Sequence, residues 1–166
     1  MKIFRGFHRP GLASACALTI GNFDGVHRGH QAMLALLNNE ASLRGVPSCV
    51  LTFEPHPRDY FAQIHKRPAL APARIGTLRD KLAELERCGV QQVVVQPFNA
   101  AFAALSAQAF IDDVVLRGLG ARIVLTEDPM LAAKGAHYLN TDVWASMGQE
   151  AEQLRREQAF EGYQLN

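Results

Sequence analysis

The sequence predicts an α/β fold of the Rossmann-like type, a three-layer α/β/α arrangement in which helices cover both faces of a parallel sheet. Short apolar runs alternate along the chain with longer segments whose apolar residues recur at helical spacing. Glycines separate many of these segments, and no internal repeat interrupts the alternation. This pattern is typical of parallel strands joined by right-handed crossover helices.

The first predicted unit is a strand, a turn and a helix. The apolar run Ala15–Ile20 predicts a buried strand that ends at Gly21 and Asn22. Apolar residues at helical spacing then predict a helix over His30–Arg44, and Gly45 is suited to end it. Such a unit places the turn between strand and helix at the carboxyl end of the strand, where open parallel sheets bind ligands.

The second predicted strand, Ser48–Phe53, is followed by a stretch punctuated by prolines. Pro55 and Pro57 argue against a continued helix or strand ladder, because proline lacks the backbone N–H that both require. We therefore expect a loop that begins at Glu54. This loop also lies at the carboxyl end of its strand, beside the first one.

Two further helix and strand pairs are expected. Thr77 as an N-cap and Gly89 as a stop predict a helix between them, followed by a strand at Val93–Val95. A helix is expected over Ser106–Leu116, with a strand at Arg122–Thr126 after it. These four strands make one sheet with the chemistry on the loops after the first two.

Length and composition limit the protein class. A chain of 166 residues with 48% apolar and 20% charged residues suits one globular domain. The net charge of +1 gives no long-range attraction to nucleic acid or to an anionic membrane, so neither is expected as a partner. No stretch resembles a leader peptide or a membrane span, so a cytoplasmic protein is expected. Cys16, Cys49 and Cys88 lack C-x-x-C spacing and are interpreted as small buried hydrophobes, not as metal ligands.

The segment GNFDGVHRGH, Gly21–His30, carries the pattern most typical of chemistry. It combines three glycines, an aspartate and two histidines between a strand and a helix. Glycine lets the backbone approach an anion closely, and the N–H groups of a helix start can face it. His27 and His30 can present two imidazoles to one polyphosphate, as neutral donors or as cations. The alternative is an ordinary turn with surface histidines.

A phosphate site of this kind needs no covalent nucleophile. The phosphate of a bound acceptor can attack the α-phosphorus of ATP directly, so positioning and electrostatics supply the catalysis. Mg²⁺ is expected to be shared by the ATP phosphates. The segment matches neither the Walker A pattern nor the dinucleotide G-x-G-x-x-G pattern.

GNFDGVHRGH resembles the signature of the bacterial FAD synthetases, the riboflavin kinase/FMN adenylyltransferase enzymes, within the H-x-G-H nucleotidylyltransferase superfamily. The resemblance continues through LTFEPHPRDYF, RIGTLRDKLAELERCGV and FNAAFAALSAQAFIDDVV and covers residues 1–124. It implies transfer of AMP from MgATP to FMN, giving FAD and pyrophosphate. The matches at Leu51–Phe61 and Phe98–Val115 disfavour another H-x-G-H transferase, one that acts on a sugar or lipid-head-group phosphate.

The resemblance also implies roles for residues. His27 and His30 would be catalytic by stabilising the transition state. Asp24 would hold the loop by bonding backbone amides, or would contact Mg²⁺. His56 and Arg58 are possible substrate contacts, with a polar loop rim as the alternative. The residues expected to bind ATP are Gly21, Asn22, Phe23, Asp24 and Gly29.

Beyond Val124 the sequence leaves this family's pattern. A flavin-binding stretch resembling V-G-x-D-F-R-F-G and a later serine/threonine-rich segment ending in arginine are both absent, and no riboflavin kinase domain is expected. MgATP binding is therefore expected more readily than transfer to FMN. The competing hypothesis is a non-catalytic chimeric or designed α/β protein.

Residues 125–166 instead resemble an internal segment of ornithine carbamoyltransferase. Asp142, Ser146 and Met147 match residues that contact ornithine in that family, but its S-x-R-T-R motif is absent here, so we interpret them as structural. An engineered or recombined chimera and a natural truncated gene with a replaced tail both explain this junction. The tail is expected to complete the same domain with a helix at Pro129–Lys134, a strand at His137–Thr141 and a helix at Gln149–Phe160.

Overall fold

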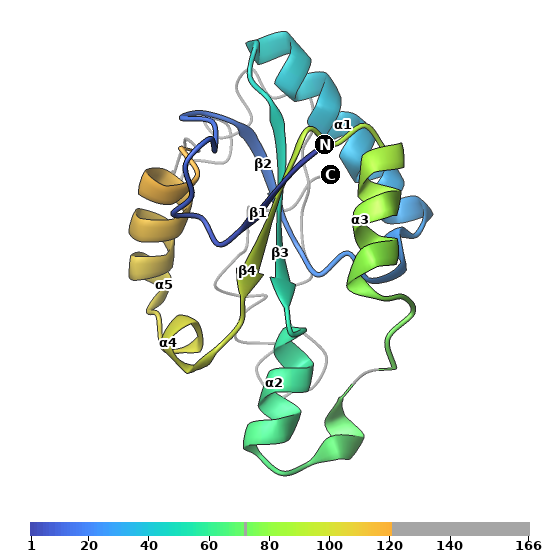
Figure 1. The fold of residues 1–166 in the computed structure, drawn as a ribbon, viewed down its shortest axis with the longest axis vertical. Coiled ribbons are helices and arrows are strands. Elements are labelled where there is room, and N and C mark those ends of the chain that lie inside the picture. The colour runs from blue at the N-terminus through green and yellow to red at the C-terminus, as the bar shows by residue number, and fades with distance from the viewer. Residues whose placement is uncertain (72, 121–166) are drawn as a thin grey trace, which may run out of the picture. The chain divides into compact units, whose positions relative to one another are not determined.

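The computed structural model describes residues 1–71 and 73–120, and within them one parallel sheet carries the fold. Four strands lie in the order β1-β4-β3-β2, and each neighbouring pair is parallel (Figure 1). The predicted parallel α/β class is therefore confirmed. The strands are β1 (Lys2–Arg5), β2 (Ala17–Ile20), β3 (Ser48–Glu54) and β4 (Gln92–Pro97).

Helices cover both faces of this sheet, as the three-layer prediction requires. On one side lie α1 (Arg28–Arg44) and α3 (Leu78–Arg87) (Figure 1). On the other side lie α4 (Ala100–Ala103), α5 (Ala107–Ala109) and the π-helix η3 (Phe110–Gly118) that continues α5. The shorter elements are η1 (Asp24–Val26), α2 (Pro57–Ile64) and η2 (Pro68–Leu70).

Each face of the sheet has its own apolar core, because side chains alternate across a strand. Val50 and Val93 pack with α1 and α3 on one face, whereas Leu51 and Val94 pack with η3 on the other. β3 and β4 are the central strands and are buried on both faces, which explains why they read as continuous apolar runs.

The predicted helix ends are confirmed by their caps. Gly45 ends α1 with a left-handed φ of 63°, a conformation that glycine adopts without a steric cost. Thr77 begins α3 in a reciprocal cap, since its hydroxyl accepts the N–H of Asp80 and the Asp80 carboxylate accepts the N–H of Thr77. Ser106 begins α5 with a one-way cap, in which its hydroxyl accepts the N–H of Ala109.

The prediction of a loop that begins at Glu54 was wrong in part, because α2 begins at Pro57. Proline is tolerated in the first turn of a helix, where its missing N–H has no intrahelical partner. The ring nitrogen Nδ1 of His56 accepts the N–H of Arg58 at 3.1 Å and caps the helix. The edge strand β1 and the single turn of α4 were not predicted from the sequence.

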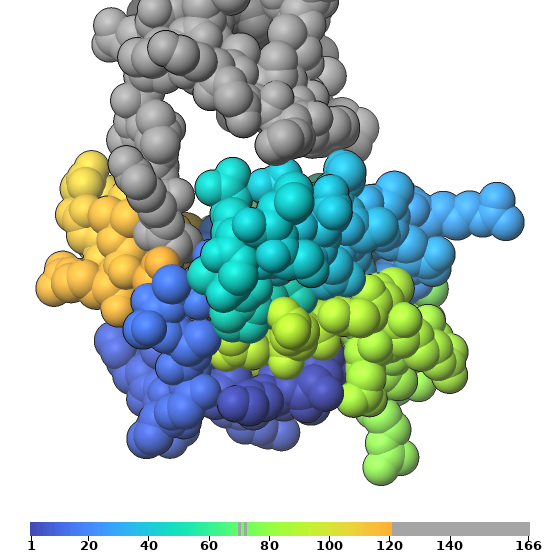
Figure 2. Space-filling view, turned by 90° about the horizontal axis from the view of Figure 1, so that it is seen from above, coloured from blue at the N-terminus to red at the C-terminus, as the bar shows by residue number. Residues whose placement is uncertain are grey.

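The amino ends of the strands gather at the end of the sheet that is opposite α2 (Figure 1). Figure 2 looks onto this end, where the last turn of α1, the end of α3 and the N-terminus lie together. The Met1 amine donates to Glu86 Oε1 at 3.1 Å there. The carboxyl ends of the strands, and the loops expected to carry chemistry, lie at the other end.

Several predictions fall outside the described residues: the strand at Arg122–Thr126 and every element and residue predicted within 125–166. Cys16, Cys49 and Cys88 are free thiols, and Cys49 is fully buried. Among the helices of the described ranges, none has the length and apolarity needed to cross a membrane.

Candidate functional site

The loop Gly21–His30 leaves the carboxyl end of β2 and enters α1. It is bonded to the neighbouring strand β3 at two points. The N–H of Gly21 donates to the carbonyl of Leu51 at 3.0 Å, and the Thr52 hydroxyl donates to the carbonyl of Asn22 at 3.2 Å. The start of the loop is therefore held on the end of the central sheet.

The backbone of this loop is tightly wound. Phe23, Gly25 and Val26 have φ values of 51°, 70° and 35°, in the left-handed region that β-branched residues rarely occupy. The side chains of Phe23 and Val26 are each 1% exposed and lie in the core beneath α1 and α3. Burial of two apolar side chains offsets the backbone strain. Phe23 can therefore meet a ligand only through its backbone.

His27 and His30 lie together at the start of α1. Their rings are stacked, with centroids 3.7 Å apart and planes 17° apart. His27 is the N-cap, and its Nδ1 accepts the N–H of His30 at 3.3 Å. Because Nδ1 acts as the acceptor in this hydrogen-bond network, a neutral His27 carries its proton on Nε2. The predicted pair of imidazoles is thus one unit at a helix N-terminus.

His30 has a pKa below the ordinary histidine value. Burial of the imidazole is the largest cause, and the charge of His27 acts in the same direction, while Asp24 opposes both. Nδ1 of His30 is buried and has no hydrogen-bond partner among the described residues. The neutral form of His30 is therefore favoured near pH 7.

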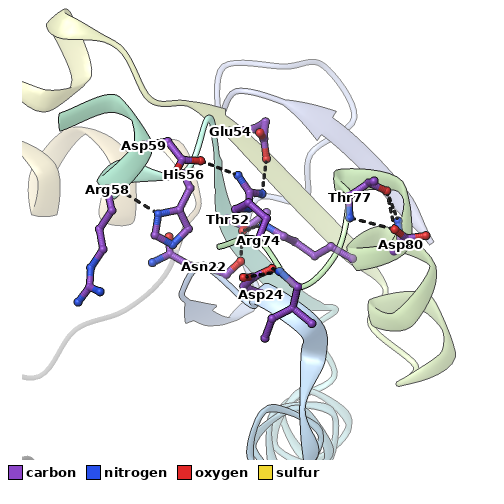
Figure 3. Close-up of polar contacts among 12 residues, drawn as sticks. Asn22, Asp24, Thr52, Glu54, His56, Arg58, Asp59, Arg74, Thr77 and Asp80 are labelled. Carbon is purple, nitrogen blue, oxygen red and sulfur yellow. Dashed lines mark hydrogen bonds and ion pairs between the residues drawn. The ribbon is translucent and has the colours of Figure 1, made fainter. Parts of the chain in front are cut away.

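The Asp24 carboxylate closes the loop onto a distant segment. It accepts the backbone N–H of Ile75, with Oδ1 at 3.2 Å and Oδ2 at 3.1 Å (Figure 3). Gly25 lies against the same residue, since a Cβ built on it would be 2.8 Å from Ile75 Cγ2. The carboxylate therefore bonds a backbone amide, which was one of the two roles expected of it.

A guanidinium joins the end of β3 to α2. Arg74 donates from Nη1 to Asp59 and from Nη2 to Glu54, each at 3.1 Å (Figure 3). Two ion pairs on one planar group are geometrically specific. Sequence reasoning did not select Arg74 or its partners. The available signal was that Arg74 opens one of the segments that resemble the FAD synthetases.

His56 and Arg58 have different environments. His56 is 7% exposed and caps α2, and its pKa is lowered chiefly by burial. Arg58 is exposed, and its side chain extends away from the Glu54 and Arg74 pair in Figure 3. His56 therefore has a structural role as a helix cap, while Arg58 is the one of the two whose side chain is exposed.

Lys81 is a further residue that sequence reasoning missed. It lies on α3 and is 3% exposed, and its Nζ donates to Thr52 Oγ1 at 3.3 Å. The signal was its position three residues after Leu78 and one before Leu82, on the apolar stripe of the helix. A lysine on such a stripe faces the core.

Metal-ligating side chains do not cluster in the described part of the chain, where no group of three His, Cys, Asp or Glu residues could hold an ion. Asp24 is the carboxylate nearest in sequence to the histidine pair. A cavity of about 540 Å³ lies beside α2, lined by residues that include Pro55, Asp59 and Ala62.

Comparison with known proteins identifies relatives. The family model described as FAD synthetase matches residues 10–141, past Val124. The bifunctional riboflavin kinase/FMN adenylyltransferase of Escherichia coli K12 is 45% identical over 130 residues, which are 77% of this chain. The chain spans only 40% of the length of that relative.

Two further matches are to proteins that are described differently from the FAD synthetases. An ornithine carbamoyltransferase of Nitratidesulfovibrio vulgaris DP4 is 38% identical over 138 residues, which cover 78% of this chain and 45% of the relative. This match is longer than the tail 125–166. A crystal structure described as a macrolide-efflux protein from Streptococcus pneumoniae superimposes with a TM-score of 0.57 at 25% identity, over 72% of this chain and 39% of that one.

Proposed function

Because the chain belongs to the FAD synthetase family, we propose that Gly21–His30 binds the triphosphate of MgATP and that the domain transfers AMP to FMN, giving FAD and pyrophosphate. The stacked pair His27 and His30 at the start of α1 is the observation that carries this proposal. MgATP binding is the stronger of the two functions, since the sequence lacks a stretch resembling V-G-x-D-F-R-F-G.

Binding of the triphosphate rests on the start of a helix. The first N–H groups of α1, a helix of 17 residues, have no intrahelical acceptors and carry a partial positive charge. They attract phosphate oxygens and orient them over the loop. Mg²⁺ bound to the ATP phosphates neutralises part of their charge. Gly29 stands in the first turn, so no side chain there obstructs an approaching phosphate.

The histidine pair acts on developing charge. His27 offers Nε2–H, and a neutral His30, whose ring stacks on that of His27, supplies a second N–H donor. Two donors aimed at the bridging and leaving oxygens stabilise the pyrophosphate as it departs. No protein nucleophile is needed, because the FMN phosphate attacks the α-phosphorus itself. Arg58 is the proposed contact for that acceptor.

The test is FAD production from FMN and MgATP by the purified chain, followed by chromatography. Replacing both histidines, His27→Ala with His30→Ala, should abolish FAD formation if the pair is catalytic. MgATP binding is measured separately by calorimetry in both proteins. Turnover that survives in the double variant would contradict the catalytic role, and absence of MgATP binding in the parent chain would contradict the assignment of the loop.

A second candidate is a non-catalytic α/β protein that combines parts of two families. This candidate rests on the resemblance of residues 125–166 to an internal segment of ornithine carbamoyltransferase. This candidate predicts cooperative unfolding and no FAD formation, with MgATP binding retained or lost. Detectable turnover that depends on His27 and His30 would exclude it.

A further inference from the structure

Lys81 is an unusual feature of the core beside the loop Gly21–His30, which we call the glycine loop. Lysine is almost never fully buried unless it is paired with an opposite charge. Lys81 is 3% exposed, and within residues 1–71 and 73–120 it takes part in no ion pair. Its hydrogen bond is the one that Nζ donates to Thr52 Oγ1 at 3.3 Å. A buried cation without an ion-pair partner destabilises the fold, so we look for a functional reason for its position.

The bond from Lys81 determines what the Thr52 hydroxyl can do. A hydroxyl has one proton to donate and accepts through its lone pairs. Since Oγ1 accepts from Lys81, its own proton is directed to the carbonyl of Asn22 at 3.2 Å. Thr52 is fully buried, so water does not compete for either bond. Lys81, Thr52 and Asn22 therefore form a directed chain from α3 through β3 to the glycine loop.

This chain orients one peptide unit of the loop. A trans peptide is planar, and its N–H points opposite to its C=O. Thr52 holds the Asn22 carbonyl toward β3, so the N–H of Phe23 points to the side of the loop away from β3. The left-handed φ of Phe23 and its buried ring keep the unit in this orientation.

We propose that Lys81 is a positioning residue for the anion site: through Thr52 it holds the Asn22–Phe23 peptide so that the Phe23 N–H is presented to the phosphates of ATP. The ligand class, a nucleoside triphosphate, rests on the proposed function. The hydrogen-bonded chain itself does not depend on the proposed function, because it is formed by protein groups and involves no ligand.

The environment of Lys81 disfavours its charged form, which indicates that Lys81 has a role other than stabilising the fold. Burial lowers its pKa most, and the Arg74 guanidinium from the segment before α3 lowers it further. Glu54 at the end of β3 and Asp24 in the loop act in the opposite direction without forming an ion pair. Replacing such a lysine with an apolar side chain of similar length is expected to leave the fold as stable or more stable.

The first experiment compares three variants by MgATP calorimetry and by thermal unfolding. Lys81→Met removes the donor and keeps the stem, and Thr52→Val removes the hydroxyl and keeps the shape. Both should weaken MgATP binding about tenfold, the effect of one misaligned charge-assisted hydrogen bond. Lys2→Met, on the far edge strand, is the matched control and should leave binding unchanged. The Tm of Lys81→Met should equal or exceed that of the parent, which a purely structural lysine would not allow.

The second experiment needs no nucleotide. The backbone amide of Phe23 is followed by ¹⁵N NMR and by hydrogen exchange in the same variants of the full chain. Its resonance should move and its exchange should change in Lys81→Met and in Thr52→Val, and both should stay unchanged in Lys2→Met.

The two experiments separate the inference from the proposed function. A parent chain that binds no MgATP would contradict the proposed function, while the Phe23 amide would still test the hydrogen-bonded chain. If the resonance and the hydrogen exchange of the Phe23 amide are unchanged in both Lys81→Met and Thr52→Val, the positioning role is overturned. So would a Lys81→Met protein whose Tm falls in parallel with a loss of MgATP binding.

Discussion

The carboxylate of Asp24 accepts the backbone N–H of Ile75, although 51 positions separate the two residues in the sequence. This bond ties the glycine loop to the segment that enters α3. It joins two of the segments that resemble the FAD synthetases, Gly21–His30 and Arg74–Val90.

The loss of stability at acid pH should be smaller when Asp24 is replaced by an uncharged residue. Burial raises the pKa of Asp24, but the N–H groups of Ile75 and Gly76 and the charge of Arg74 outweigh it and hold the pKa below 3.8. A lowered carboxyl pKa stabilises the fold above the unfolded value and is lost as pH falls through the folded value. The free energy of unfolding, from urea titrations at pH 5 and pH 2.5, should fall less steeply in Asp24→Asn. An unchanged slope would contradict the lowered pKa.

The contact between Gly25 and Ile75 should be measurable with glycine substitutions. Gly25→Ala should destabilise the fold by about 1–2 kcal/mol for its left-handed φ, and further for the 2.8 Å contact with Ile75. Gly45→Ala is the control, because Gly45 has a similar φ of 63° and no atom within 4 Å of the new Cβ. The excess loss in Gly25→Ala should shrink in the Ile75→Ala background, which removes the side-chain atoms at 2.8 and 3.1 Å and keeps Cβ at 3.2 Å. Equal losses at both glycines would refute the contact.

The pKa of His30 should respond to its stacked neighbour. Burial and the charge of His27 lower it below 6.5. In His27→Ala the charge is removed while much of the burial remains, so the pKa of His30 should rise and stay below 6.5. An NMR titration of the imidazole protons measures both proteins. Because charging a buried neutral histidine disfavours the fold, the His30 contribution to stability is present above pH 6.5 and is lost as pH falls below the folded pKa. A His30 pKa at or above 6.5 in the parent would contradict this account.

Arg74 should not tolerate lysine. Its two bonds, to Glu54 and Asp59, diverge from one planar guanidinium, and an ammonium group cannot make both in the same geometry. Arg74→Lys should lower the free energy of unfolding by about 1 kcal/mol, a modest value because the groups are partly solvated. Arg79→Lys, on the exposed side of α3, should have no effect. Equal stability of the two variants would show that the ion pairs contribute nothing.

Local signals predicted much of the fold correctly. Apolar periodicity and capping depend on neighbouring residues. They therefore predicted the strands at Ser48 and Val93 and the caps at Thr77 and Ser106. The helix α2 was missed because Pro57 reads as a breaker and permits a helix only at its first turn. The edge strand β1 carries Lys2 and Arg5 and lacks the apolar run that marks the central strands.

The sequence by itself determined the α/β class and the glycine loop with its two histidines, because strand and helix patterns and the H-x-G-H spacing are written within short segments. Only the tertiary structure decided that Asp24 meets Ile75, that Arg74 joins Glu54 to Asp59, and that Lys81 reaches Thr52. These contacts join residues far apart in the chain. Their partners are selected by how two helices pack on one sheet face and by which polar groups that packing removes from water, and no local pattern encodes either.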